Sequence, residues 1–417
     1  MPDRRLLATV WLTATVGVAL AEWPQWLGPR RDGTATVRIG VWQGGLPVLW
    51  RQPVGEGHSG PVVAGGLVYV HARVADREQE EVLALQLKTG QVVWRQAYDR
   101  PKFENPFGNG PRATPLVTPD GQLFTLGASG ILCCWDARTG KLFWRKDLLA
   151  EFSAKNLFFG VSSSPLLVTE QERKWLVLMV GGADAALVAL DPANGQTLWK
   201  SGNDPASYSS PVLMEFGGRK LIVALTARHL VAMDVRTGRW LATYPFADKL
   251  NETAITPVII GDRVFISSIT AGSVLLRLRE QDGQLQWQEL WKNPQLNCYF
   301  ATPVIVGEHL FVVQNQLLPP LARLNCLKLA DGQLIWKQPE NSRILGKYHG
   351  TLLRAEDKVL VLKEDGELLL IEARAENFKE LARARVCGNT WAHPALSENL
   401  LVVRDEKEIR CLLLPQP

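Results

Sequence analysis

The sequence lacks the short motifs that mark common catalytic sites. It contains no G-x-S-x-G, H-E-x-x-H, C-x-x-C or C-x-x-C-H pattern, which argues against the hydrolases, zinc proteases, redox proteins and haem proteins that carry them. Its six histidines show no metal-ligand spacing. The glycine-rich pieces at 55–60 and 108–110 are predicted to be turns rather than phosphate loops. The sequence therefore offers no catalytic residue, no metal ligand and no cofactor-binding residue.

An excess of charge of one sign is also absent. The chain has 46 Lys and Arg against 42 Asp and Glu, so the formal net charge is +4, and no long charge run occurs. This balance gives no reason to expect a nucleic-acid partner. No stretch shows the period of a long amphipathic helix.

A long apolar run occurs at the N-terminus. Arg4 and Arg5 precede the uncharged run 6–21, which ends in Ala19-Leu20-Ala21. This pattern predicts a signal peptide over residues 1–21, and the run is short for a bilayer span. The alternative is an uncleaved membrane anchor. No Cys lies near the cleavage point, which disfavours a lipid anchor. We expect an exported protein, periplasmic or extracellular, without a stable membrane span after cleavage.

A short β-unit recurs along the rest of the chain. The stretch 131–144, ILCCWDARTGKLFW, has near-copies at 82–94, 187–199 and 324–336, weaker copies at 230–244 and 275–287, and a remnant at 368–381. A Thr-Gly, Asn-Gly, Asp-Gly or similar pair closes each turn between two Val- and Leu-rich strands, as in β-hairpins. The turn glycines are Gly90, Gly140, Gly195, Gly238, Gly283 and Gly332.

A tryptophan recurs four residues after the turn glycine. A large ring at one fixed strand position predicts a repeated docking contact between neighbouring units. These tryptophans are Trp94, Trp144, Trp199, Trp287 and Trp336, and Trp50 takes the same place in an unpaired strand near the N-terminus.

The number and the ends of the units predict the architecture. Each unit opens with small residues, a Pro and a Val/Leu/Ile run, and eight such openings occur, two of them degenerate. Residues 46–54 resemble only the second strand of a repeat, and residues 408–414 only the first, so together they would close a ring. We predict an all-β fold over 46–417: an eight-bladed β-propeller of four-stranded antiparallel blades. Seven blades is the alternative, because the unit at 350–386 is the most degenerate.

Residues 22–45 precede this ring. Two Trp, two Pro and two Gly fall within WPQWLGPRRDG at 23–33. This composition predicts an ordered loop lying on a surface, neither strand nor helix.

The repeat resembles a known superfamily. The pattern small-x-Asp-x-x-Thr-Gly-x-x-x-Trp, seen from Cys134 to Trp144, is similar to the repeat of pyrroloquinoline-quinone-like (PQQ-like) propellers. The similarity covers nearly all of the chain after residue 21. It implies the fold strongly and function weakly, because these residues build blades. The chain resembles both the propeller lipoprotein of outer-membrane assembly and the quinoprotein propellers.

The quinoprotein resemblance directs attention to the cysteines. Quinoprotein alcohol dehydrogenases use a disulfide between adjacent cysteines beside the quinone, which would correspond to Cys133-Cys134. The repeat alignment favours another reading, since Cys134, Cys326 and Cys411 stand where other units carry Ala. We interpret them as small packing residues. A disulfide between Cys298 and Cys387 stays open.

The propeller arrangement predicts a ring of residues around the central funnel. Three places before each Pro, or its equivalent, the chain has His58, Arg112, Ser162, Tyr208, Ala254, Phe300, His349 and Trp391, and Tyr299 and Tyr348 precede two of these. The mixture of aromatic and basic groups predicts a binding mouth. The candidate ligand-binding residues are His58, Arg112, Tyr208, Tyr299, Phe300, Tyr348, His349 and Trp391.

A quinone with Ca²⁺ would need clustered oxygen ligands. Five places before the Pro motifs stand Glu56, Glu252 and Asn389, but the fifth unit lies across the ring from the first and eighth. We therefore expect no cofactor, with PQQ and Ca²⁺ as the alternative.

These features favour one function over another. The favoured hypothesis is an exported, non-catalytic propeller that binds or scaffolds a protein or a small ligand, with cell-envelope assembly as one setting. The alternative is a PQQ-dependent dehydrogenase that oxidises alcohols or sugars.

Overall fold

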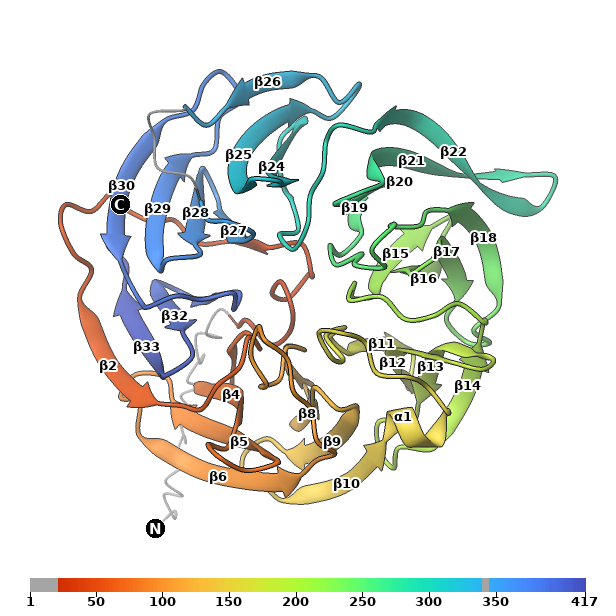
Figure 1. Cartoon of the computed structure of the whole chain (residues 1–417), viewed down its shortest axis with the longest axis horizontal. Helices are drawn as coiled ribbons and strands as arrows, with labels where there is room; N and C mark the ends of the chain where they lie inside the picture. The colour runs from red at the N-terminus through yellow and green to blue at the C-terminus, as the bar shows by residue number, and fades with distance from the viewer. Residues whose placement is uncertain (1–21, 340–344) are drawn as a thin grey trace, which may run out of the picture.

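Eight β-sheets surround a central axis (Figure 1). The structure, a computed structural model, describes residues 22–339 and 345–417. The predicted signal peptide at 1–21 lies outside these residues. The prediction of an all-β, eight-bladed propeller is confirmed, and the seven-blade alternative is wrong, because the degenerate unit forms a complete sheet.

The first four blades follow each other directly along the chain. Each has its first strand innermost and its fourth outermost (Figure 1). Blade 1 contains β3 (Val62–Ala64), β4 (Leu67–Arg73), β5 (Gln79–Gln86) and β6 (Val92–Asp99); blade 2 contains β7 (Leu116–Val117), β8 (Gln122–Leu126), β9 (Ile131–Asp136) and β10 (Leu142–Asp147); blade 3 contains β11 (Leu166–Glu170), β12 (Arg173–Gly182), β13 (Ala185–Leu190) and β14 (Thr197–Ser201); blade 4 contains β15 (Val212–Phe216), β16 (Arg219–Leu225), β17 (His229–Asp234) and β18 (Trp240–Pro245).

Blades 5 to 8 continue the ring, and the last is built from both ends of the chain. Blade 5 contains β19 (Val258–Ile260), β20 (Arg263–Ser268), β21 (Gly272–Gln281) and β22 (Gln284–Asn293); blade 6 contains β23 (Val304–Val306), β24 (His309–Leu317), β25 (Pro320–Lys328) and β26 (Leu334–Lys337); blade 7 contains β27 (Gly350–Ala355), β28 (Lys358–Lys363), β29 (Glu367–Glu372) and β30 (Glu380–Arg385); blade 8 contains β31 (Ala395–Ser397), β32 (Leu400–Arg404), β33 (Glu408–Leu413) and β2 (Val48–Pro53).

The pairing of β2 with β33 closes the ring as the sequence predicted. Trp50 lies opposite Cys411, and Pro53 opposite Glu408, in an antiparallel register. Closure joins the two ends of the row of blades, which would otherwise expose their faces to water.

A tryptophan from each of five blades packs on the turn of the next blade. The indole N–H of Trp94 donates to the carbonyl of Ala137 at 2.9 Å, and a methyl group added at Gly140 would lie 2.6 Å from the ring. Glycine is therefore required there both for its positive φ of 72° and for the closeness of the ring. The same arrangement joins Trp50 to Leu87 and Gly90, Trp144 to Pro192 and Gly195, Trp199 to Val235 and Gly238, and Trp291 to Leu329 and Gly332.

The predicted docking role of Trp287 is wrong. The hairpin of β21 and β22 is longer than in other blades, so its turn at Gly283 projects past the neighbouring blade, with nothing within 4 Å of an added methyl. Trp291, which lies four residues further along β22, packs on Gly332 instead. Trp336 makes a third kind of contact: its ring packs edge-on against Phe378, because the turn of blade 7 lacks a glycine.

The cysteines fill packing positions. Cys134, Cys326 and Cys411 lie directly opposite Trp144, Trp336 and Trp50 on neighbouring strands, where a small side chain leaves room for the indole. All six cysteines are buried and free, so neither Cys133-Cys134 nor Cys298 with Cys387 forms a disulfide. Burial raises the pKa of the Cys326 and Cys411 thiols to about 12, which keeps them protonated and unreactive.

The Ser or Thr before the Pro links neighbouring inner strands at several of the motifs. The backbone N–H of Thr114 donates to the hydroxyl of Ser164, and that of Ser164 donates to the hydroxyl of Ser210, both at 2.9 Å. Thr256 and Thr302 repeat the bond at 3.1 Å. The recurrent Ser or Thr therefore satisfies backbone donors that face the channel.

The N-terminal segment is more deeply buried than its composition suggested. We call residues 22–35 the plug. Its Trp23 is 2% exposed and Arg31 6% exposed, and its residues 34–35 form a short strand, β1 (Thr34–Ala35), that pairs in parallel with β27. The prediction of a surface loop without a strand is thus wrong, because the unpaired carbonyls and hydroxyls at the channel end offer partners that the sequence does not show.

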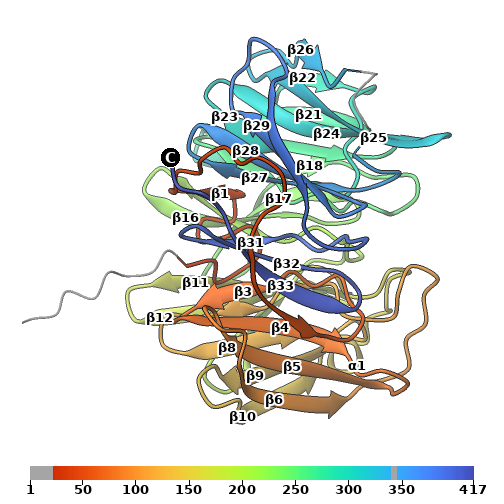
Figure 2. The same cartoon turned by 90° about the vertical axis from the view of Figure 1, so that its left-hand side faces the viewer.

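The plug joins blades on several sides of the channel. Arg31 donates to the carbonyls of Ser164 and Pro165 at 3.1 and 2.8 Å, and the Trp26 indole donates to the Thr256 hydroxyl at 2.8 Å. Burial lowers the pKa of Arg31 to about 9, which leaves it charged at neutral pH. Figure 2 shows β1 and α1 (Leu148–Glu151), the one short helix among the described residues, on opposite faces of the ring, so the plug closes one end of the channel. Within the described residues, no helix is long and apolar enough to cross a membrane.

The docking contact can be tested by comparing two turn glycines. Gly140 and Gly283 have nearly equal φ angles of 72° and 73°, but only Gly140 lies against an indole. We expect Gly283→Ala to lower the free energy of unfolding by about 1–2 kcal/mol through left-handed strain alone. Gly140→Ala should lower the free energy of unfolding by about 1–3 kcal/mol more than Gly283→Ala does, because Trp94 must move. Urea unfolding midpoints measure both, and equal losses would contradict the docking role.

Candidate functional site

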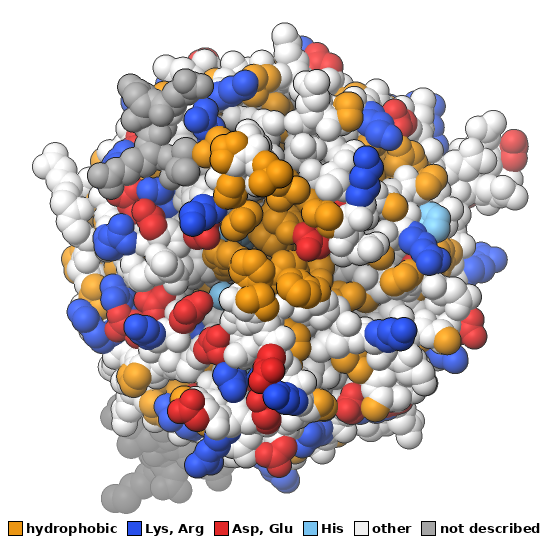
Figure 3. Space-filling view, in the orientation of Figure 1, with side chains coloured by type: hydrophobic (Ala, Val, Ile, Leu, Met, Phe, Trp, Pro, Cys, Tyr) orange, Lys and Arg blue, Asp and Glu red, His pale blue; other side chains and the backbone are white. Residues whose placement is uncertain are grey.

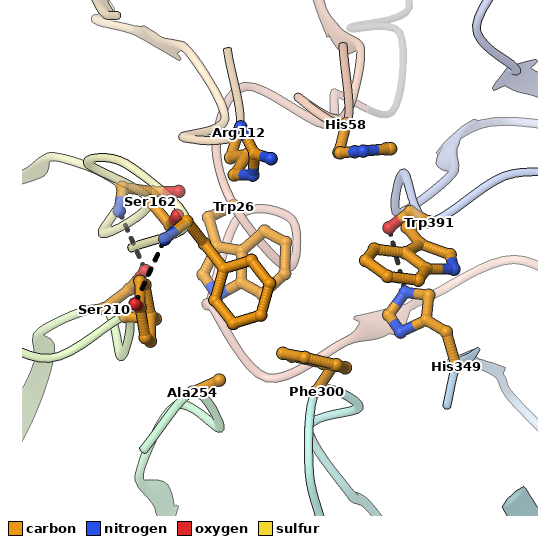
Figure 4. Close-up of a pocket in the computed structure, with 12 residues that line it drawn as sticks. Trp26, His58, Arg112, Ser162, Ser210, Ala254, Phe300, His349 and Trp391 are labelled. Carbon is orange, nitrogen blue, oxygen red and sulfur yellow. Dashed lines mark hydrogen bonds between the residues drawn. The ribbon is translucent and has the colours of Figure 1, made fainter. Parts of the chain in front are cut away.

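A pocket of about 110 Å³ lies in the central channel, with Trp26 of the plug in its lining. Every one of the eight positions predicted to ring the funnel lines it: His58, Arg112, Ser162, Tyr208, Ala254, Phe300, His349 and Trp391. Figure 4 shows the labelled members of this set converging from segments of different blades, with Arg112 and His58 across the pocket from Phe300 and Ala254. The spacing from the Pro motif places them because each inner strand begins next to that Pro.

Two of the predicted candidates lie elsewhere. Tyr299 and Tyr348 do not line this pocket. The ring of Tyr299 stacks on Phe300, with centroids 3.7 Å apart, and its hydroxyl donates to Glu252. Tyr299 therefore positions Phe300 from behind. The backbone N–H of Tyr348 donates to Glu364 at 3.0 Å.

Four lining residues were not predicted. Ser164 and Ser210 belong to the Pro motifs themselves, and Phe159 lies four residues before the motif that begins at Ser163. The fourth, Trp26, comes from the plug and closes the far end of the pocket (Figure 4). The pair of tryptophans in residues 23–26 was the available signal, but nothing in the sequence assigns that segment to the channel.

Four aromatic rings form a closed cycle across the mouth. Phe107 contacts Phe159 and Trp391, with centroids 5.6 and 5.8 Å apart, and Phe300 contacts the same two rings at 6.0 and 5.7 Å. We call these four residues the aromatic ring. Phe107 is 39% exposed and the adjoining Phe158 60% exposed. Figure 3 shows hydrophobic side chains gathered at the centre of this face, with charged side chains around them.

The pocket contains a single charged side chain among the twelve that line it. Burial lowers the pKa of His58 to about 3, helped by the nearby Arg112 charge, and lowers that of His349 to about 4. Both imidazoles are therefore neutral at pH 7, and their Nε2 atoms donate to the carbonyls of Phe107 and Trp391. Burial also lowers the pKa of Arg112 to about 10, so its guanidinium stays charged.

A buried ionic network holds the loop that carries Phe107 and Arg112. Glu80, fully buried, accepts from the Tyr98 hydroxyl at 2.6 Å and from Arg100 at 3.1 Å, and it lies 3.4 Å from His71. Arg100 also donates to the carbonyl of Asn109 within that loop at 2.6 Å. The network therefore fixes the loop to blade 1.

The residues present do not fit a quinone with Ca²⁺. The pocket has no carboxylate in its lining, and its volume is close to that of a cavity of about 150 Å³ that binds one benzene ring. Glu56 pairs with Arg73 at 3.4 Å, and Glu252 accepts from Tyr299. Among residues 22–339 and 345–417, no three His, Cys, Asp or Glu side chains form a group that could hold a metal ion.

Comparison with known proteins gives a consistent family. The family model described as outer membrane protein assembly factor BamB matches residues 45–96, 78–274 and 250–413. Relatives with that name include the Shewanella oneidensis protein, 25% identical over 70% of this chain and 72% of the relative, and the Yersinia pestis protein, 25% identical over 60% and 63%.

Solved structures share the fold at low identity. BamB from Moraxella catarrhalis has a TM-score of 0.64 and 12% identity, covering 88% of this chain and 100% of that one. A europium-containing methanol dehydrogenase also reaches 0.64, at 13% identity, covering 93% and 89%. A quinohemoprotein alcohol dehydrogenase from Pseudomonas putida reaches 0.61 at 12% identity, covering 95% and 81%. These likenesses establish the propeller and nothing about its chemistry.

The Glu80 network predicts a pH-dependent stability. Burial alone would raise the pKa of Glu80, but hydrogen bonds from His71 and Tyr98 and the charge of Arg100 lower it to about 2. Because this pKa is lower in the folded state, the stabilisation is complete above about pH 4.5 and is lost as pH falls toward 2. Glu80→Gln should therefore lower the free energy of unfolding at pH 7 by about 3 kcal/mol and much less at pH 2.5.

The control for this measurement is Glu280→Gln. Glu280 pairs with Arg219 at 3.0 Å on the surface, where its side chain is 44% exposed. Surface pairs contribute about 0–1 kcal/mol, so this variant should follow the wild-type curve. A Glu80→Gln curve parallel to wild type from pH 7 to 2.5 would contradict the assignment.

Proposed function

Because this chain belongs to the family of outer membrane protein assembly factor BamB, we propose that it is an exported, non-catalytic propeller that binds protein chains in the assembly of outer membrane proteins. The aromatic ring over the plugged channel is the proposed binding site. The plug holds the opposite end shut and leaves one mouth for a partner.

The observation that carries this proposal is the exposed aromatic cluster at that mouth. Phe107 and Phe158 are exposed beside Phe159, whereas large apolar side chains on the surface of a monomer usually occur singly. Aromatic residues and Arg dominate the energetics of protein interfaces, and Arg112 lies below the same cluster. The combination supports a protein partner.

A dehydrogenase reaction is the less favoured function. The enzymes of similar structure share 12–13% identity, which extends to the fold alone. The pocket lacks the carboxylates that a Ca²⁺–quinone site would need, and Cys133 and Cys134 are buried within β9, away from the lining. We therefore favour a binding role without a cofactor.

Site-specific cross-linking tests the proposed mouth. A photoreactive phenylalanine at position 158 should cross-link in cells to outer membrane proteins or to proteins that assemble them. The same group at position 143 on β10 is the control, because Phe143 is also exposed, at 46%, but lies on an outer strand. Equal cross-linking of the same partners from both positions would contradict a specific mouth.

Truncation gives a quantitative version. Phe107→Ser with Phe158→Ser should weaken binding of the cross-linked partner about tenfold or more, since each interface aromatic contributes about 1 kcal/mol or more. The control pair, Val93→Ser with Phe143→Ser, removes side chains of similar exposure from two outer strands and should leave the Kd within about twofold. Retained affinity in the mouth variant would overturn the proposed site.

Cofactor binding discriminates the enzyme alternative. We expect purified protein mixed with PQQ and Ca²⁺ to show neither stoichiometric binding by calorimetry nor dye reduction with alcohols or sugars. Tight stoichiometric binding would reject the non-catalytic function.

A further inference from the structure

The pocket beneath the aromatic ring has one accessible end. Trp26 closes the other end and is fixed by its bond to Thr256, 2.8 Å long, within a plug that also bonds to blades 1, 3 and 7. A polypeptide cannot run through such a pocket. It can insert a side chain from a loop, or it can insert a chain end.

The walls of the pocket set the kind of side chain that fits. Phe159, Tyr208, Phe300 and Trp391 line a space of about 110 Å³. A cavity of about 150 Å³ lined by apolar groups binds benzene, so this space suits one phenyl group or one branched aliphatic side chain of a ligand. Larger ligands would have to displace the aromatic ring.

Arg112 gives the pocket a partly buried positive charge that forms no ion pair. Its guanidinium donates to the carbonyls of Gly108 and Gly110 at 2.8 and 3.0 Å, and no acidic side chain of the described residues lies within ion-pair distance. Glu56, a nearby carboxylate, pairs with Arg73 instead. Because the guanidinium is partly buried and forms no ion pair, an incoming carboxylate would gain a charge-assisted bond.

Glu364, a carboxylate outside the lining that is bonded to Trp391, is already satisfied. Glu364 accepts from the Trp391 indole at 3.0 Å and from the backbone N–H groups of Lys347 and Tyr348 at 2.7 and 3.0 Å. Its role is to orient Trp391. The pocket therefore keeps an overall preference for an anion.

His349 adds a hydrogen-bond acceptor, its Nδ1 atom, to which no group of the described residues donates. Its Nε2 donates to the carbonyl of Trp391, which leaves Nδ1 as an acceptor, and Nδ1 has no hydrogen-bond partner in the described part of the chain. His349 is 7% exposed, so this buried acceptor carries a desolvation penalty that a ligand N–H would relieve.

We propose that this pocket binds the C-terminal residue of a polypeptide. The apolar side chain lies among the aromatic walls, the terminal carboxylate pairs with Arg112, and the residue's amide N–H serves His349. A closed pocket favours a chain end over a loop, and the Arg112 charge repels the ammonium of an N-terminus. The inference rests on the proposed function, because it specifies which part of a protein partner enters the mouth.

Matched peptides test this inference. N-terminally labelled pentapeptides of sequence Gly-Ser-Gly-Ser-Phe, ending in a free acid or in an amide, are titrated with the full protein by fluorescence polarisation. We expect the acid to bind about tenfold or more tightly than the amide, as a charge-assisted pair requires. The inference would be overturned if the acid and the amide bound equally, or if the acid did not bind at about 1 mM protein.

Two variants assign the selectivity to the guanidinium. Arg112→Gln should abolish the preference for the acid, and Arg112→Lys, which keeps the charge, should restore part of it. Unchanged acid preference in Arg112→Gln would overturn the assignment, provided that its urea midpoint matches wild type. If the midpoint of Arg112→Gln falls, the assignment is tested by Arg112→Lys and by wild type. It stands if wild type prefers the acid and Arg112→Lys keeps part of that preference, and it fails if either binds acid and amide equally.

Competition by a small acid distinguishes binding of a peptide C-terminus from binding of any carboxylate that carries an aromatic group. 3-Phenylpropanoate carries the ring and the carboxylate but no amide N–H, so we expect it to compete about tenfold less well than the peptide acid. Equal competition would reject the peptide assignment. If position 158 still cross-links its partner but acid and amide peptides bind equally, the chain-end inference fails while the proposed function stands.

Discussion

The contact between an indole and the glycine turn of the next blade is the interaction on which the ring depends. A flat sheet has two apolar faces, and each blade can bury them only against its neighbours. Trp94 on Gly140, with its N–H on the carbonyl of Ala137, fixes both the distance and the register between two blades. The contact recurs at five junctions and holds the outer strands of one blade against the turn of the next, which supports the ring around the pocket.

Local repetition is why the fold could be predicted so completely. The turn glycines, the docking tryptophans and the Pro motifs are each encoded within one unit, and the orphan strands at 46–54 and 408–414 revealed the closure. The same repetition identified Cys134 as a packing residue. It failed at Trp287, because a longer hairpin shifts which tryptophan reaches the neighbour, and hairpin length is not readable from spacing to the turn.

The site was predictable where it is part of the repeat and unpredictable elsewhere. Counting from the Pro motif gave eight lining positions, since the inner strands place them by symmetry. Trp26 and the aromatic contacts of Phe107 lie in segments that occur once, so no sister copy shows where they pack. The charge state of the pocket also needed the structure: it shows neutral His58 and His349 beside charged Arg112. Function in this molecule is therefore concentrated in the non-repeated segments that seal one end of a symmetric channel and cover the other with aromatic rings.

The most direct measurement is a crystal structure of the protein with a Phe-terminated peptide acid. We predict density for the terminal ring between Trp391 and Phe159, with the carboxylate within about 3 Å of the Arg112 guanidinium, as a charge-assisted hydrogen bond requires. Peptide density on an outer strand such as β10, with an empty channel, would contradict the assignment of the aromatic mouth as the binding site.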